Sequence, residues 1–87
     1  VTANVTPRAM ADMCRAAIAG DIATAVELNN KMFPLHQKLF IEPNPVPVKW
    51  ALAEMGKMPA GIRLPLVPLA ADCHEAVRAA LREAGAL

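Results

Sequence analysis

The stretch Glu42-Pro43-Asn44-Pro45-Val46-Pro47-Val48-Lys49-Trp50 divides an otherwise helix-rich chain into two parts. Its prolines stand at alternate positions, and each one disfavours a helical conformation in the residue before it. We therefore expect an extended backbone where the chain begins this stretch. Pro47 also fits the first turn of a helix, so the sequence predicts a short helix from Pro47 to Met55, closed by Gly56.

Two helices are predicted before this stretch. The first begins at Thr6-Pro7, where the Thr6 side chain can cap free amides and Pro7 suits the first helical position, and it ends at Gly20. Asp21 then caps a helix over residues 22–40. Pro34 lies inside that helix and removes one backbone hydrogen bond, which predicts a bend. The alternative is two helices broken near residue 33.

Apolar side chains recur at helical spacing in both of these helices. In the first helix the stripe consists of Met10, Met13, Cys14, Ala17 and Ile18. In the second the apolar members are Ile22, Ala25, Val26, Met32, Phe33, Leu39 and Phe40, and the polar Asn29 and His36 lie on the same stripe. A histidine on such a stripe is more often a hydrogen-bonded packing residue than a ligand, and we interpret His36 in that way.

The two ends of the chain differ in character. Val1 to Val5 contains β-branched residues at positions 1, 2 and 5, which predicts the trailing end of a strand whose partner strands would lie upstream. At the other end, a second proline-rich loop over residues 57–69 leads to a final helix over residues 71–84, stopped by Gly85. Its apolar stripe consists of Cys73, Val77, Ala80, Leu81 and Ala84.

Composition and charge exclude several classes of function. The chain has 87 residues, of which 55% are hydrophobic and 20% charged, and its formal net charge is +1. Without a basic run it is not predicted to bind nucleic acid, and its apolar runs are too short for a membrane span of roughly 20 residues. No signal peptide is recognisable. Because the chain is short and unusually apolar, we expect part of its surface to lie against another partner.

The sequence offers no catalytic constellation. Lys49 could act as a Schiff-base lysine only with an acid or base nearby, but the chain has no tyrosine, and neither Glu42 nor Glu54 has a clear partner. Cys14 and Cys73 are predicted to be reduced packing residues. No metal site or cofactor is predicted, because no histidine or cysteine pair has ligand spacing.

Three segments resemble the dihydrodipicolinate synthase family. They are Val1-Thr2-Ala3-Asn4-Val5 with Pro7, then Phe40 to Ala51 with Glu42, Asn44, Pro45, Pro47 and Lys49, then Arg63-Leu64-Pro65-Leu66 with Pro68-Leu69. Pro34-Leu35-His36 adds to the likeness, which covers the whole chain. The Asn-Pro-x-Pro-x-Lys pattern is shared with other pyruvate-dependent aldolases and lyases, so N-acetylneuraminate lyase stays an alternative. The preceding Glu-Pro and the following Trp favour the synthase.

The resemblance implies a mainly α fragment of a much longer enzyme, a (β/α)8 barrel followed by a C-terminal helical domain. Such enzymes are homo-oligomers, usually tetramers, in the cytoplasm. They condense pyruvate with aspartate semialdehyde in the biosynthesis of lysine and diaminopimelate, and lysine often inhibits them. Pyruvate is held as a Schiff base on a barrel lysine, assisted by a tyrosine relay and a threonine-rich loop.

On this mapping, residues 1–20 are the end of the eighth strand and the eighth barrel helix, and residues 21–87 are the C-terminal domain. No catalytic residue of the family falls on this chain, so the chain alone is predicted to be inactive. Thr2 and Asn4 are expected near the barrel mouth. Glu42, Asn44, Pro45, Pro47, Lys49, Arg63 and Pro65 are expected to have structural roles. The alternative from another class of function is a free-standing helical module that binds other proteins.

Overall fold

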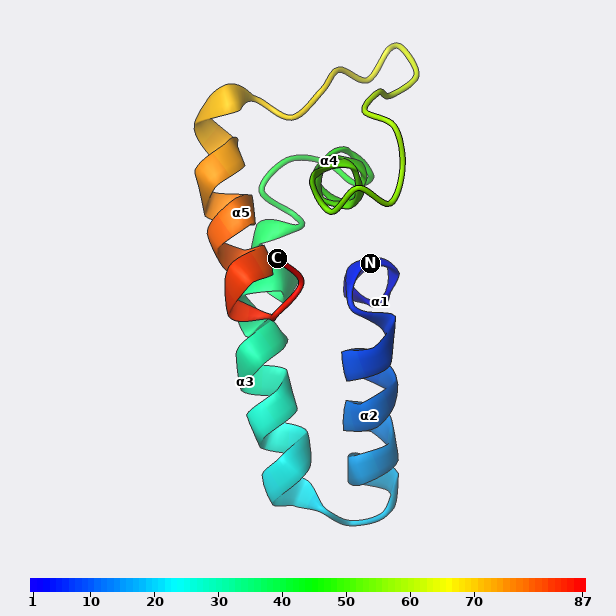
Figure 1. Cartoon of the computed structure of the whole chain (residues 1–87), viewed down its shortest axis with the longest axis vertical. Coiled ribbons are helices and arrows are strands. Elements are labelled where there is room, and N and C mark those ends of the chain that lie inside the picture. The colour runs from blue at the N-terminus through cyan, green and yellow to red at the C-terminus, as the bar shows by residue number, and fades with distance from the viewer.

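The computed structural model describes all residues from Val1 to Leu87, and every regular element in it is helical. The molecule is elongated, with extents of 44 × 21 × 20 Å. Figure 1 shows α2 and α3 as an antiparallel hairpin, with α5 beside the second half of α3. The elements are α1 (Thr2–Val5), α2 (Pro7–Ile18), α3 (Ile22–Lys38), α4 (Val46–Glu54), the 3-10 turn η1 (Ala71–Cys73) and α5 (His74–Glu83).

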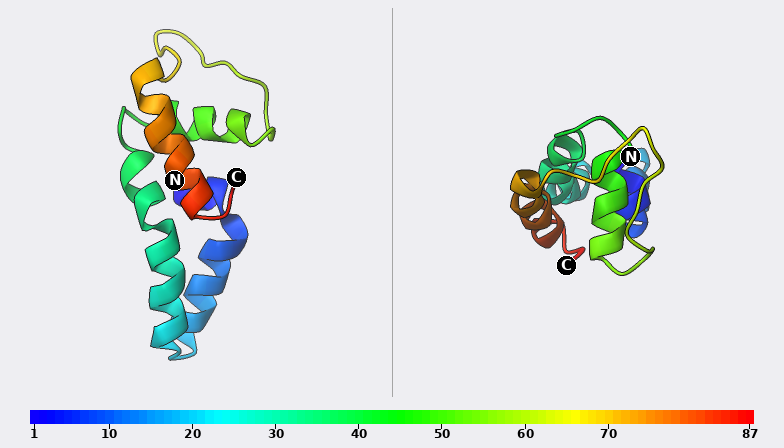
Figure 2. Two further views of the ribbon diagram at one scale, coloured as in Figure 1. Left: turned by 60° about the vertical axis from the view of Figure 1, so that its left-hand side comes forward. Right: turned by 90° about the horizontal axis from the view of Figure 1, so that it is seen from above.

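The hydrophobic core lies at the end of the molecule where α1, the second half of α3, α4 and α5 meet. Helix α4 runs across this end, and the proline-rich loop after it arches over the top before the chain returns in α5 (Figure 2). The buried cluster consists of Val5, Leu35, Leu39, Val46, Val48, Ala51, Leu69, Val77, Ala80 and Leu81. No helix combines the length and apolar character needed to cross a membrane.

The predicted boundaries of the first three helices are confirmed to within two residues, whereas the last predicted helix begins as the 3-10 turn η1 and becomes α-helical only at His74. Pro7 opens α2, and Gly20 follows it with a φ of +83°, a conformation in which a Cβ is strained. Asp21 caps α3, because its carboxylate accepts a hydrogen bond of 3.2 Å from the Thr24 N–H. Helix α3 passes through Pro34 without a break, so the alternative of two helices is wrong.

The prediction of a strand end over the first five residues is wrong for this structure. Residues Thr2–Val5 form the single turn α1, in which the Thr6 N–H donates to the Thr2 carbonyl at 2.9 Å. β-branched residues favour a strand only when a neighbouring strand takes up their backbone groups. No strand lies in this structure, so local helical hydrogen bonds satisfy them instead.

The predicted cap at Thr6 is also wrong. The residue does precede α2, but its side chain makes no hydrogen bond to the helix amides. The Thr6 hydroxyl is turned toward α1 and α3, where it donates to the Thr2 carbonyl at 3.4 Å and lies 3.5 Å from the Met32 sulfur. Thr6 therefore joins helices instead of capping one.

The single apolar stripe predicted on α3 separates into two faces. Met32, Leu35 and Leu39 are fully buried and face the core. The other side of α3 carries Ile22, Val26 and Phe33, because spacings of four and seven residues keep a common face. These three side chains are 62%, 51% and 49% exposed, and Phe40, just after the helix, is 59% exposed. A helix that is apolar on two sides is typical of one covered on both.

The free end of the hairpin has no core of its own. Helix α2 contains no buried residue, and Ile18 at its end is 87% exposed. Cys14 is exposed and Cys73 half-buried; both are free thiols, as predicted, but Cys14 is not a packing residue here. The hairpin thus extends an apolar surface away from the rest of the molecule.

Candidate functional site

The residues predicted at a barrel mouth lie together on α1 but differ in their surroundings. Thr2 is only 5% exposed, and its hydroxyl forms a hydrogen bond of 2.7 Å with Nδ1 of His36 on α3. His36 is thus a hydrogen-bonded packing residue, as predicted. Asn4 is exposed and lines a cleft of about 670 Å³ between the start of α2 and the ends of α4 and α5, together with Arg8 and Lys57.

The proline-rich segment builds the first turn of α4. The helix begins at Val46, one residue before the predicted start, and the Lys49 N–H donates to the Pro45 carbonyl at 3.0 Å. Val46, Pro47 and Val48 are buried, so this turn is anchored in the core. Asn44 is exposed, and the Asn44–Pro45 peptide bond is cis.

Lys49 is half-buried beside a small apolar pocket. The pocket has a volume of about 90 Å³ and is lined by one side of α4 and the loop above it, including Trp50, Ile62 and Leu69. None of the four ion pairs in the structure involves Lys49. The carboxylates of this chain thus supply no partner for a Schiff-base lysine at this position, and the structural role of Lys49 stays a prediction.

The remaining family-motif residues lie on the surface. Glu42 and Pro65 line one groove of about 340 Å³ between the two proline-rich loops. Arg63 is exposed and takes part in no ion pair, although its carbonyl accepts a hydrogen bond of 3.2 Å from the Leu66 N–H. The structure does not bring these residues to Thr2 or Lys49 in a shared reactive site.

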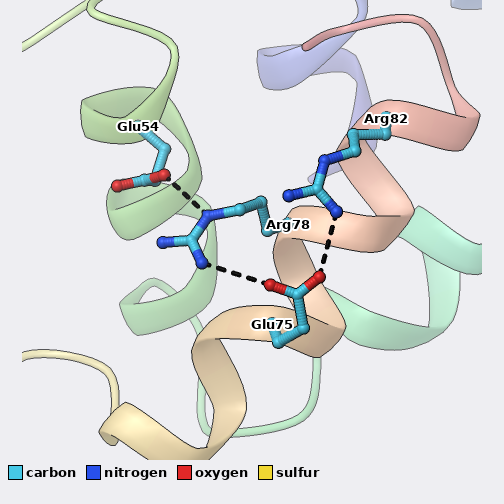
Figure 3. Close-up of polar contacts among 4 residues, drawn as sticks. All are labelled: Glu54, Glu75, Arg78 and Arg82. Atoms are coloured by element: carbon cyan, nitrogen blue, oxygen red, sulfur yellow. Dashed lines mark hydrogen bonds and ion pairs between the residues drawn. The ribbon is translucent and has the colours of Figure 1, made fainter.

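A polar cluster between α4 and α5 was not predicted from the sequence. Arg78 bridges two helices, because its Nε donates to Glu54 at 3.1 Å and its Nη1 donates to Glu75 at 3.2 Å (Figure 3). Arg82 donates to the other Glu75 oxygen at 2.9 Å. Glu54 therefore has a clear partner, contrary to the sequence analysis. The signal was the Glu75-Arg78-Arg82 spacing, which places three charges on one face of a helix.

The same cluster includes an aromatic stack. The rings of Trp50 and His74 are stacked with their centroids 4.5 Å apart, and the Arg78 guanidinium lies 5.5 Å from the centre of the Trp50 ring. The His74 Nε2 is 3.0 Å from the Leu69 carbonyl. These contacts fasten α4, α5 and the loop between them to one another.

The ion pairs of this cluster predict a pH dependence of stability. Hydrogen bonds from Arg82 and Arg78 hold the pKa of Glu75 below its ordinary value of 4.5. A carboxyl whose pKa is lower in the folded state stabilises the protein above its unfolded pKa, and this contribution is lost as the pH falls through the folded pKa. We expect the melting temperature of the unmodified protein to drop between about pH 5 and pH 3. The melting temperature of the Glu75→Gln variant should drop less steeply over the same range. Parallel pH curves for the two proteins in thermal melts would contradict this.

The Cys73 thiol is not activated, and the side chains of the structure are not grouped to hold a metal ion. The pKa of the Cys73 thiol is raised above its ordinary value of 9.0, mainly by burial and to a smaller extent by the charge of Asp72. The thiol therefore stays protonated near neutral pH. No group of three or more His, Cys, Asp or Glu side chains could hold a metal ion.

Comparison with known sequences identifies relatives along the whole chain. The sequence pattern of the "Dihydrodipicolinate synthetase family" matches residues 1–84. A 4-hydroxy-tetrahydrodipicolinate synthase from Herminiimonas arsenicoxydans is 62% identical over 87 residues, and one from Methylococcus capsulatus is 66% identical. In both cases the match covers 100% of this chain and 30% of the relative. The chain therefore spans about a third of the length of the curated relatives it matches.

Solved structures give the same result for the fold. The chain superposes on a dihydrodipicolinate synthase from Acinetobacter baumannii, crystallised with pyruvate and described as chloride-inhibited, with a TM-score of 0.93 and 55% identity. It superposes on a monomeric dihydrodipicolinate synthase variant with a TM-score of 0.94 and 40% identity. Each match covers 100% of this chain and 29–30% of the other. The mainly helical fold, as a segment of a larger enzyme fold, is thereby confirmed.

Proposed function

Because the chain belongs to the dihydrodipicolinate synthetase family, we propose that it is the C-terminal segment of a 4-hydroxy-tetrahydrodipicolinate synthase. The whole enzyme would condense pyruvate with aspartate semialdehyde through a lysine Schiff base, in the biosynthesis of lysine and diaminopimelate. The observation that carries this proposal is identity of 62–66% along the entire chain with relatives of that name.

The contribution of this segment would be structural. We place the end of the barrel at residues 1–20 and the C-terminal domain at 21–87. The exposed apolar face of α3 and the coreless hairpin support this view, since both present apolar surface that the rest of a longer enzyme could cover. In the barrel family the active site lies where strands end, so α1 would lie at the mouth and the other helices behind it.

The proposal is tested by trapping pyruvate with borohydride. Reduction of a lysine imine leaves a stable adduct, which mass spectrometry of peptides locates on one residue. We expect the full-length enzyme to be labelled on a lysine upstream of Val1, and the 87-residue chain to show no labelling above background. Labelling of Lys49 in either protein would refute the assignment of a structural role to that lysine.

A second assay separates the synthase from its closest alternative. The full-length enzyme should consume aspartate semialdehyde with pyruvate and should not cleave N-acetylneuraminate. The reverse result would favour N-acetylneuraminate lyase, which shares the Asn-Pro-x-Pro-x-Lys pattern at Asn44 to Lys49. A free-standing interaction module is less well supported, because such a module would pair its apolar stripes with each other, and one face of α3 stays exposed.

Several properties of the whole enzyme follow from the same proposal. It would be a cytoplasmic homo-oligomer, a tetramer in the usual family arrangement, and lysine could act on it as an inhibitor. Nothing in the chain calls for a cofactor or for nucleic acid. Size-exclusion chromatography of the full-length enzyme would check its oligomeric state. Activity assays with added lysine would check the inhibition.

A further inference from the structure

The contact between Thr2 and His36 joins the first helix to the third across 34 positions of sequence. It is the most distant side-chain hydrogen bond in the structure, and at 2.7 Å it is short and well formed. The Thr2 side chain is nearly inaccessible to water, so its hydroxyl would lose a partner if His36 were replaced by an apolar residue.

The orientation of the His36 ring is fixed from a second side. The ring of Phe33 meets it edge-on, with centroids 6.3 Å apart and an interplanar angle of 89°. Phe33 and His36 lie one turn apart on α3, so both come from the same rigid element. The imidazole is thus presented to Thr2 by a helix that passes unbroken into the core.

Helix α1 cannot hold its own position. It has only four residues, Thr2–Val5, and a single helical turn is unstable without tertiary contacts. Its anchors are Val5 in the core, the Thr6 hydroxyl on the Thr2 carbonyl, and the Thr2 hydroxyl on His36. Only the last of these fixes the beginning of the turn to another helix through a side-chain hydrogen bond. Asn4, on the same turn, faces the open cleft.

We propose that His36 is a positioning residue, which holds α1 through Thr2 and thereby sets the place of Asn4 at the edge of the active site. This inference rests on the proposed function, which puts α1 at the barrel mouth. His36 touches no reacting atom and acts through Thr2. Because displacement of an active-site element by about 1 Å can cost about a hundredfold in rate, loss of the contact should slow the reaction.

The test uses the full-length enzyme with two matched pairs of substitutions. Thr2→Val removes the hydroxyl at nearly constant shape and Thr2→Ser keeps it, while His36→Leu removes the ring nitrogen and His36→Asn keeps a hydrogen-bonding group near Nδ1. We expect Thr2→Val and His36→Leu to lower kcat/KM for condensation by about tenfold or more, and the conservative partners to stay within about threefold. The double variant Thr2→Val/His36→Leu should be no slower than the slower single variant.

Val77→Ala serves as the control for a loss of stability alone, because Val77 is a fully buried residue of α5 that makes no hydrogen bond to α1. It should lower the melting temperature and leave kcat/KM unchanged below that temperature. If Thr2→Val fails to fold, the comparison of His36→Leu with His36→Asn decides. Equal kcat/KM for the removing and the conservative variants would overturn the inference. Absence of pyruvate trapping in the unmodified enzyme would instead overturn the proposed function.

Discussion

Replacing Leu39 by alanine should destabilise the 87-residue chain by about 2–5 kcal/mol, the usual range for truncating a buried leucine. Leu39 is completely buried and lies at the end of α3, in the cluster that joins α3 to α4 and α5. Truncation removes apolar burial and leaves a cavity that three elements would have to close together. Small domains are stable by only about 5–15 kcal/mol, so the loss should be visible as a large drop in the midpoint of urea unfolding.

The matched control is Leu64→Ala, which makes the same chemical change in the proline-rich loop. Leu64 is 79% exposed and buries little, so its truncation should change stability by less than about 0.5 kcal/mol. Urea unfolding followed by circular dichroism measures both variants under the same conditions. Equal shifts in the two midpoints would mean that the core is not centred on Leu39.

Local signals in the sequence were sufficient to place the long helices. Pro7, Asp21 and Gly20 mark starts and a stop by their own backbone and side-chain chemistry, and the structure confirms all three. The final helix was placed correctly because Val77, Ala80 and Leu81 repeat at helical spacing, and all three are buried. Such features depend on residues a few positions apart, which a single sequence displays directly.

The features that the sequence did not reveal depend on partners far along the chain. Val1 to Val5 has strand propensity, but whether it extends depends on a neighbouring strand. Thr6 has the chemistry of a helix cap, but its hydroxyl donates instead to the Thr2 carbonyl and the Met32 sulfur. The pairing of Glu54 with Arg78 spans 24 positions and required the crossing of α4 over α5. For the candidate site, His36 was correctly interpreted as a hydrogen-bonded residue, whereas its partner Thr2 was not identified.

The double substitution Ile22→Glu/Val26→Lys should abolish self-association of the isolated 87-residue chain. Both residues lie on the exposed apolar face of α3 and are more than half exposed. Burial of an apolar side chain of this size contributes about 1.5–3 kcal/mol, so removing two of them should weaken association by well over tenfold. The change keeps the net charge constant and places Glu one turn before Lys, a spacing that stabilises a helix.

Sedimentation velocity over a wide range of concentrations would measure the effect. We expect the unmodified chain to sediment above its monomer mass of 9.3 kDa and the double variant to sediment at that mass. Ala79→Lys, which adds a charge to an exposed position of α5, should associate as the unmodified chain does. A compact monomer for the unmodified chain at every concentration would show that the exposed face of α3 does not drive association. If the double variant still associates, the contact lies on another surface, and the apolar side of α2 with Ile18 is the next one to change.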